Sequence, residues 1–480
     1  MTQQQKKQVV PIIMMVLLFG MISFVTNLAA PMGIVLKNQF GLSNFLGLLG
    51  NAANFIAYAV MGIPGGILLS KIGYKKTALI AIAIGFVGVG IQYLSGHFAS
   101  FGIYLLGAFI AGFSMCLLNT VVNPMLNTLG GGGNKGNQLI QVGGSFNSIM
   151  ATITPMFVGI LIGEAAKAKI TDIFPVMYIA MAVFAIVFFV LLAVSIPEPN
   201  AEKATESLSG LMKGALSFRH FILGAFAIFV YVGVEVGTPG IANLYMTTYT
   251  SEQADGIVNE YQKQQSDEIY LNALSQEDES NKDTNGYESK VILKNVYEKA
   301  QQVISQDVKP GLGISTGIAG TIVGFYWLLM LFGRLIGASI GNKVSSKKMM
   351  TYVSLVGCIL VLLAMFIPTS ASINISGLIG KPTVIPLSIA FLILVGLCTS
   401  IMWGGIFNLA VEGLGKYLAA ASGIFMVLVC GGGILPALQG FIADIAGYMN
   451  SYWVIVISLV YLLYYALIGS KNINKNIPVD

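Results

Sequence analysis

The chain has 480 residues, of which 55% are hydrophobic and 10% charged, and its mean hydropathy is +0.79. Soluble domains carry about 25% charged residues, so this composition excludes a soluble globular protein and predicts one that lies in a lipid bilayer. The net charge of +5 does not indicate nucleic-acid binding, because the basic residues gather in short loops and no basic, aromatic-interleaved surface is visible.

Apolar stretches recur along the whole chain, each near the length of about 20 residues that a bilayer needs. They predict an all-α membrane protein with twelve transmembrane helices. The expected spans are 9–36, 46–70, 76–95, 101–127, 138–163, 174–196, 219–248, 312–342, 348–368, 384–411, 416–443 and 450–469. No small-residue cleavage site follows the first apolar run, which is therefore interpreted as a retained helix and not as a cleaved signal.

The basic residues of the short loops predict the orientation, since such residues are enriched on the cytoplasmic side. Lysines and one arginine cluster between spans two and three, six and seven, and eight and nine, and after span twelve: Lys71, Lys75, Lys76, Lys203, Lys213, Arg219, Lys343, Lys347, Lys348, Lys471 and Lys475. All fall on one side if the N-terminus is inside. We therefore expect both termini in the cytoplasm and a plasma-membrane location, which would be the inner membrane in a bacterium.

The chain divides into two similar parts. Residues 1–196 are expected to form an N-terminal six-helix half, 197–218 a cytoplasmic linker, and 219–480 a C-terminal six-helix half. A glycine-rich segment with a basic turn occurs at 65–76 and again at 337–348, an offset of 337 − 65 = 272 residues. Parallel repeats of this kind are typical of transporters with a substrate site between the halves. The acidic stretch 249–311 is expected outside the cell, and its preferred interpretation is an insertion without a role of its own.

The first basic turn carries a family signature. Gly66, Lys71, Gly73, Lys75 and Lys76 resemble the Gly-x-x-x-Asp-Arg/Lys-x-Gly-Arg/Lys-Arg/Lys motif of the major facilitator superfamily, with Ser70 where Asp is usual. The resemblance implies the fold of that superfamily, with two six-helix halves.

Longer runs carry a narrower resemblance. The segments 119–130, 141–148 and 231–237, together with 326–327 and 333–337, are similar to the fucose/glucose/galactose proton symporters. This similarity implies import of a hexose-like sugar by alternating access. The Asn-Asp pair that many such symporters carry in span one falls here at Ala29-Ala30, and span four has Asn119, which cannot ionise. Proton symport, symport of another cation and passive uniport therefore stay open, with passive transport the leading variant.

Polar and aromatic side chains inside the spans are the candidates for sugar binding, because amides offer both a donor and an acceptor to a hydroxyl. The candidates are Asn27, Asn51, Asn54, Tyr58, Asn119, Asn123, Asn147, Asn243, Tyr326, Trp327, Trp403 and Asn408. Asn119 and Asn123 share one helix face, as do Asn51 and Asn54. The alternative for each amide is a hydrogen bond that joins two helices.

Glu235 is the candidate for proton or cation coupling. It lies in the middle of an apolar run, where a charge costs at least about 2.5–3.5 kcal/mol and usually faces a partner or a water-filled cavity. A direct sugar contact and a purely structural role are the alternatives. No arginine or lysine is expected at its depth, because Arg334 is assigned to the cytoplasmic end of its span.

Gating or structural roles are expected for charged residues near the ends of spans: Lys71, Lys75, Lys76, Arg334, Lys343 and Glu412. The four cysteines lie in apolar spans without a partner pattern, and neither histidine has metal-ligand spacing. No metal, cofactor or enzymatic activity is expected, because no nucleophile–base constellation is present. The expected partners are a sugar, the lipid bilayer and a proton or other cation, with the protein a monomer. A drug-efflux transporter of the same fold is the alternative function, and a membrane sugar sensor is the least favoured.

Overall fold

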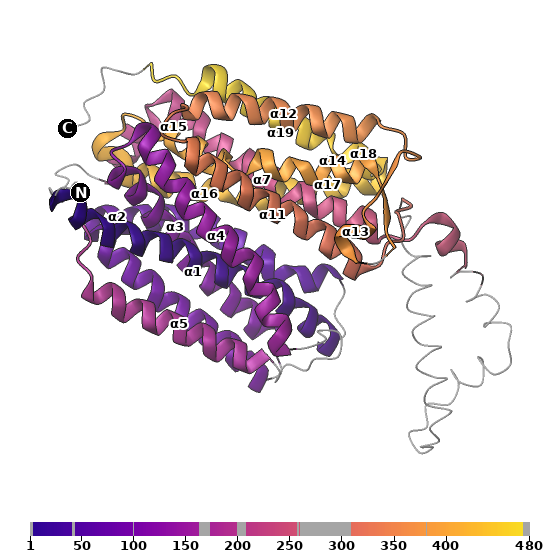
Figure 1. Cartoon of the computed structure of the whole chain (residues 1–480). Coiled ribbons are helices and arrows are strands. Elements are labelled where there is room, and N and C mark those ends of the chain that lie inside the picture. Colours follow the sequence, from indigo (N-terminus) through magenta and orange to yellow (C-terminus); the bar gives the residue numbers. More distant parts are fainter. Residues whose placement is uncertain are drawn as a thin grey trace.

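The computed structural model describes residues 3–40, 44–98, 100–162, 173–198, 208–256, 259, 309–380 and 382–473, which are mostly helical (Figure 1). Long helices of apolar sequence form because a chain in hydrocarbon must satisfy its backbone hydrogen bonds internally. α5 (Phe174–Ala193) exposes large apolar side chains such as Ile186 and Phe189, at 62% and 69%. Such a surface is expected only against lipid.

The first bundle contains α1 (Gln3–Phe40), α2 (Asn44–His97), α3 (Phe101–Leu129), α4 (Gly133–Ile162) and α5. Within it α2 packs along α3 and α5, and α1 packs along α4. The short helix α6 (Leu208–Leu216) then leads into the second bundle and packs against α16 of that bundle.

The second bundle begins with α7 (Arg219–Thr247) and continues with α11 (Thr316–Ile340), α12 (Ser346–Phe366), α13 (Ser376–Ile379), α14 (Leu387–Thr399), α15 (Met402–Ala410), η2 (Gly415–Tyr417), α16 (Leu418–Val427), η3 (Leu428–Cys430), α17 (Gly431–Ala446), α18 (Tyr448–Ser451), α19 (Trp453–Tyr464) and the π-helical η4 (Tyr465–Gly469). α7 lies at its centre and packs against α15, α17 and α19. Two short antiparallel strands, β1 (Ser372–Asn374) and β2 (Val384–Pro386), form a hairpin between α12 and α14.

The helices agree with the predicted fold class. Within the described residues, ten helices are long and apolar enough to cross a membrane. One of them, Ala53–His97, spans 45 residues and accounts for two expected spans, and the less apolar α4 covers a further one. The arrangement is thus consistent with twelve spans.

The predicted break between spans two and three is present at Gly73, where two helices that together make up α2 meet at a kink. The positive φ of 81° at this residue is one that glycine adopts without strain. One predicted span needs correction. The expected helix 384–411 begins after a strand and is interrupted between α14 and α15. There the Ser400 hydroxyl donates to the Leu397 carbonyl oxygen instead of pointing away from the helix.

The two bundles meet at one end of the molecule, which Figure 1 shows as the end where α1 begins, opposite the hairpin and α13. Close glycine packing and amide hydrogen bonds join them there. We call these contacts the seam: Gly62 and Gly66 against Gly423, Asn127 with Asn408, Gln138 with the Ala338 carbonyl, and Gln141 with the Ile401 carbonyl. A Cβ at Gly66 would lie 2.8 Å from Gly423 Cα, so the two helices cross here at backbone distance. From the seam, α4 and α11 diverge toward the hairpin end (Figure 1).

The stretch 249–311 lies largely outside the described residues, but its two ends are joined. Gly311 N donates to Tyr249 O at 2.8 Å, and Leu312 N donates to Tyr245 O at 2.9 Å. Gly313 N likewise donates to Thr248 O at 2.8 Å. The chain therefore leaves and re-enters the second bundle at one place.

Because these hydrogen bonds join the two ends of the stretch, we expect that residues 251–309 can be replaced by a linker of about four Gly and Ser residues. Shortening a surface loop changes the free energy of unfolding by only about 0.6 kcal/mol per halving of its length. Membrane expression and sugar uptake of the shortened protein, measured beside the full chain, should agree within about twofold. A protein that is expressed and folded but no longer transports would assign a function to the insertion.

Candidate functional site

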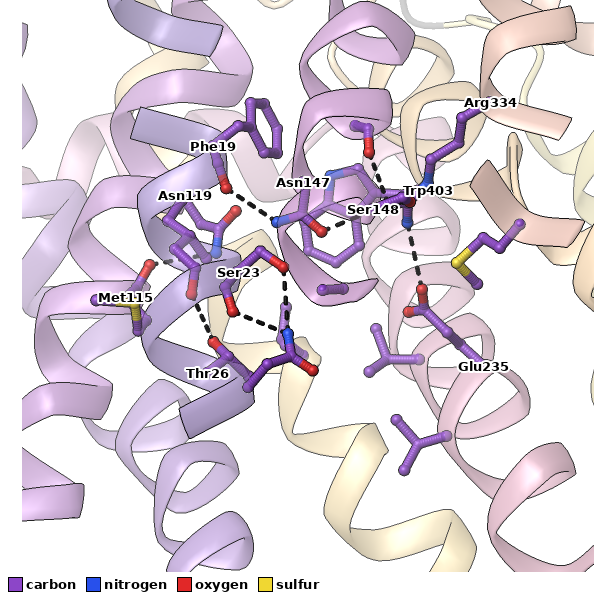
Figure 2. Close-up of a pocket in the computed structure, with 18 of the residues that line it drawn as sticks. Phe19, Ser23, Thr26, Met115, Asn119, Asn147, Ser148, Glu235, Arg334 and Trp403 are labelled. Carbon is purple, nitrogen blue, oxygen red and sulfur yellow. Dashed lines mark hydrogen bonds and ion pairs between the residues drawn. The ribbon is translucent and has the colours of Figure 1, made fainter. Parts of the chain in front are cut away.

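A cavity of about 220 Å³ lies between the two bundles, beside the seam (Figure 2). Its walls come from α1, α2, α3 and α4 of the first bundle and from α7, α11, the helix break after α14, α15 and η3 of the second. The polar or aromatic residues that line it are Phe19, Ser23, Thr26, Asn27, Asn54, Phe55, Tyr58, Asn119, Gln141, Asn147, Ser148, Glu235, Trp327, Arg334, Ser400 and Trp403. Amides, hydroxyls, an ion pair and two indole rings thus face one space.

Seven of the twelve candidate sugar-binding residues line this cavity: Asn27, Asn54, Tyr58, Asn119, Asn147, Trp327 and Trp403. Five do not. Tyr326, Asn243 and Asn408 lie elsewhere in the second bundle, and Asn123 lies directly behind Trp403. The side chain of Asn51 lies outside the described residues.

The lining amides also join helices. Asn119 Nδ2 donates to the Tyr58 hydroxyl at 2.7 Å and so ties α3 to α2. Asn147 Nδ2 donates to the Phe19 carbonyl at 3.0 Å and ties α4 to α1 (Figure 2). One amide can therefore join two helices and also line the cavity, since it can form further hydrogen bonds after the first is made.

Trp403 connects the cavity to the opposite bundle. Its indole Nε1 donates to Asn123 Oδ1 at 2.9 Å, and Asn123 Nδ2 donates to the Asn119 carbonyl oxygen at 2.8 Å. The Asn123 side chain is fully buried. Its contacts in this structure are thus with the protein, and its effect on a ligand would act through Trp403 and Asn119.

The remaining candidates make structural contacts. Tyr326 shares a hydrogen bond of 3.0 Å with Thr399 of α14. Asn408 accepts from Asn127 at 2.8 Å across the seam and donates to Ser346 at 2.9 Å. Asn243 lies two turns beyond Glu235 on α7, and its buried Oδ1 has no hydrogen-bond partner among the described residues.

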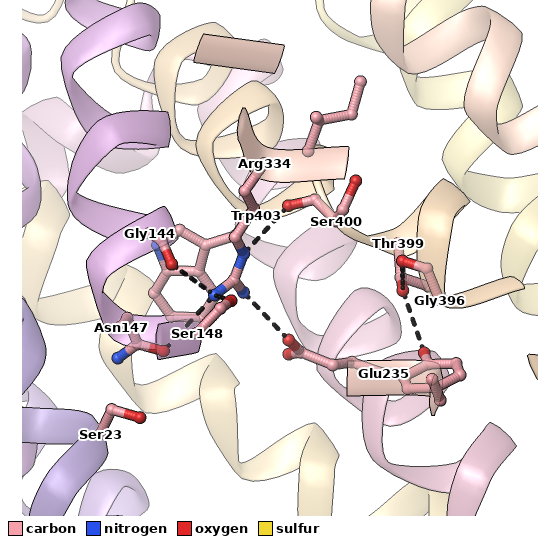
Figure 3. A network of polar contacts seen from close by, with 12 residues as sticks. Ser23, Gly144, Asn147, Ser148, Glu235, Arg334, Gly396, Thr399, Ser400 and Trp403 are labelled. Atoms are coloured by element: carbon pink, nitrogen blue, oxygen red, sulfur yellow. Dashed lines mark hydrogen bonds and ion pairs between the residues drawn. The ribbon is translucent and has the colours of Figure 1, made fainter. Parts of the chain in front are cut away.

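Glu235 faces the cavity from α7, and Arg334 of α11 meets it there. The Arg334 Nη2 lies 3.4 Å from Glu235 Oε1, and the two side chains are 10% and 15% exposed (Figure 3). The expectation that no basic residue lies at the depth of Glu235 is therefore wrong. Arg334 was assigned to the cytoplasmic end from its place in the sequence, but its long side chain reaches the cavity.

The other charged candidates lie away from the cavity. In the bend of α2, Lys75 Nζ donates to the Leu192 carbonyl at 2.9 Å, while the Glu198 carboxylate accepts from Tyr74 N and Lys75 N at 2.7 and 3.0 Å. Glu198 thus caps the helix that restarts after the bend. Lys71, Lys76, Lys343 and Glu412 lie in the same turns or at helix ends beyond the seam, and their gating role stays a prediction.

Some lining residues were missed from sequence: Ser23, Thr26, Gln141, Ser148 and Ser400. For three of them the sequence held a signal. Ser23 lies one turn before Asn27, and Gln141 and Ser148 are seven residues apart on the cavity face of α4. The placement of Ser400 depends on the break after α14, which no glycine or proline marks.

With this geometry established, comparisons with known proteins identify the family. The model of the Major Facilitator Superfamily matches residues 12–256, half of the chain. The chain belongs to the Major Facilitator Superfamily. It is accordingly a transporter and not an enzyme.

Relatives similar over nearly the whole chain are sugar transporters by name. A glucose/galactose transporter of Brucella abortus is 25% identical over 98% of this chain and 97% of its own length. A putative glucose/galactose transporter of Helicobacter pylori is 26% identical over 95% of both chains. The L-fucose-proton symporter of Escherichia coli is 21% identical over 92% of this chain and 89% of its own length.

Solved structures support the fold. The E. coli fucose:proton symporter matches with a TM-score of 0.72 at 17% identity, over 97% of this chain and 100% of that chain. A structure of the superfamily transporter FucP in the outward conformation gives the same TM-score at 18% identity. At this level of identity the likeness shows the fold alone.

Proposed function

We propose that this superfamily transporter imports a hexose-like sugar by alternating access. The observation that carries the proposal is the cavity between the bundles, in which amides and hydroxyls alternate with the indole rings of Trp327 and Trp403. Sugars present hydroxyls that need donors and acceptors and C–H faces that pack on aromatic rings. The names of the full-length relatives support the same substrate class.

We further propose that the seam is the cytoplasmic side of the molecule. Residues 1–196 and 219–480 then form the two halves, and 197–218 is a cytoplasmic linker. The protein lies in the plasma membrane, with both termini in the cytoplasm. The lysine-rich turns at the seam end support this orientation. The cavity of a seam-closed protein would then receive sugar from outside, and one monomer would contain a complete cavity.

The ion pair in the cavity bears on the mode of coupling. The E. coli relative is a proton symporter by name, whereas Asn119 of this chain cannot ionise. Glu235 is the carboxylate that lines the cavity, and its pair with Arg334 carries no net charge while it is ionised. A proton on Glu235 would leave Arg334 as an unpaired charge, which is costly in a poorly hydrated site. This cost favours passive transport over symport through Glu235.

The test is uptake of labelled D-glucose, D-galactose and L-fucose into proteoliposomes, with and without an imposed pH gradient. We expect saturable uptake of at least one of them in both conditions. Accumulation above the external concentration under the gradient would instead establish proton coupling. If none of the sugars is taken up while an amphipathic drug is extruded, the efflux alternative holds.

A further inference from the structure

Arg334 makes more contacts than an ion pair requires. Its Nη1 donates to the Gly144 carbonyl at 2.9 Å and to Ser148 Oγ at 2.7 Å, and it lies 3.4 Å from Asn147 Oδ1. Its Nε donates to the Ser400 carbonyl at 3.3 Å. These acceptors belong to different bundles, because residues 144–148 lie on α4 and Ser400 follows α14. Figure 3 shows the guanidinium between them and Glu235.

The chemistry of arginine suits this place. A guanidinium offers five N–H donors in a rigid plane, whereas a lysine offers one compact ammonium group. The basic residues of this chain are lysines except for Arg219 and Arg334. Arg219 begins α7 and is exposed, while Arg334 is 8% exposed inside the cavity wall. The planar donor therefore occurs at the one cavity position where carboxylate, carbonyl and hydroxyl acceptors surround a cation.

The contacts of Arg334 also occupy groups that a ligand would use. Asn147, Ser148 and Glu235 all line the cavity, and each contacts the guanidinium. A hydroxyl-rich ligand that bonds to these groups would compete with Arg334. Gln141, one turn before Ser145 and Gly144 on α4, belongs to the seam. Loosening Arg334 from α4 would thus weaken the junction next to the seam.

We propose that Arg334 is a positioning residue that holds the two bundles together at the empty cavity and releases them when a sugar takes its acceptors. Glu235 orients the guanidinium from α7, and Gly144 and Ser148 receive it on α4. The sugar-dependent step rests on the proposed function. The contact of Arg334 with α4 does not depend on the proposed function, and it is measured without any ligand.

The test measures how often the seam opens. Asn137 is fully buried, and a Cβ at Gly404 of α15 would lie 3.1 Å from its Oδ1, so opening of the bundles would expose it. In a protein whose native cysteines are replaced by alanine, the thiol introduced by Asn137→Cys is alkylated with N-ethylmaleimide. We expect Arg334→Gln to raise the alkylation rate about tenfold, as for the loss of one hydrogen bond to a charged group.

Four further variants separate loss of the contact between the bundles from a general folding defect. Arg334→Lys should give an intermediate rate, and Ser148→Ala a smaller rise in the same direction. The double variant Arg334→Gln/Glu235→Gln leaves no unpaired charge, and its rate should stay high. Arg219→Gln, which removes the other arginine at the surface, should alkylate like the parent. Each variant is compared as monodisperse protein on size-exclusion chromatography.

Two results would overturn the proposal. An unchanged rate in Arg334→Gln would mean that the guanidinium does not hold the bundles. A return to the parent rate in the double variant would attribute the effect to the unpaired Glu235 charge and not to the contact with α4. Addition of a transported sugar to the parent should raise the rate. If no sugar is transported, the proposed function is wrong. The alkylation rates of the variants without sugar still decide the role of Arg334.

Discussion

Oxidation of a Gln138→Cys/Gly341→Cys variant is expected to lower sugar uptake about tenfold or more, because the disulfide would hold the seam closed and the two halves of such transporters must rock against each other. A Cβ at Gly341 would lie 3.4 Å from Gln138 Cβ, close to the separation of about 3.5–4.5 Å that disulfides span. Gln138 belongs to α4, and Gly341 directly follows α11. Uptake is measured before oxidation, after oxidation and again after reduction.

The controls for this cross-link are the two single variants in the cysteine-free background. The single variant Gly341→Cys also shows whether the fold accepts a side chain at this position, since the added Cβ would lie 2.8 Å from the Gly337 carbonyl oxygen. Uptake should return on reduction. A cross-linked protein that transports at the rate of its reduced form would show that the seam does not open during transport.

Replacement of Glu235 by Gln is expected to lower both net uptake and exchange of sugar by about tenfold or more, since removal of one partner of a buried ion pair typically costs about 3–5 kcal/mol. The carboxylate lines the cavity and contacts Arg334, so its loss disturbs the site in every mode of transport. Net uptake and exchange are measured in the same proteoliposomes, with and without a pH gradient.

Asp444→Asn is the matched control, because it neutralises an exposed carboxylate near the end of α17 in the same bundle. It should transport like the parent. If Glu235→Gln loses only uptake against a gradient and keeps exchange, Glu235 carries a coupled proton. If Glu235→Gln behaves like Asp444→Asn, Glu235 has no role in transport.

Much of the fold follows from hydropathy and spacing. Each expected span coincides with one helix or with a run of consecutive helices, because twenty apolar residues in a row have few other stable arrangements in lipid. The glycine-rich segment before the first basic turn contributes to the seam, since Gly66 packs on Gly423 at backbone distance. The site was predictable where polar residues interrupt an apolar helix, as for Asn27, Asn119 and Glu235.

The other features of the site depend on tertiary geometry, which the spacing of residues along the sequence does not predict. Arg334 was placed by the position of its Cα along the span, but its side chain extends to α4 and α7. Ser400 lines the cavity because the helix is interrupted there, and a single serine in an apolar run does not predict such an interruption. Asn408 has the same residue type as Asn119, yet it lies at the seam because of its depth on α15.

Binding of sugar in the cavity between the bundles is measured by tryptophan fluorescence. The chain has three tryptophans. Trp327 and Trp403 line the cavity, while Trp453 is 45% exposed at the start of α19. In a Trp453→Phe variant the indole emission therefore reports on the cavity. Titration with a transported sugar should change this emission saturably, whereas a sugar that is not transported should leave it constant. Emission that stays constant at saturating concentrations of the transported sugar would mean that the sugar does not bind in this cavity.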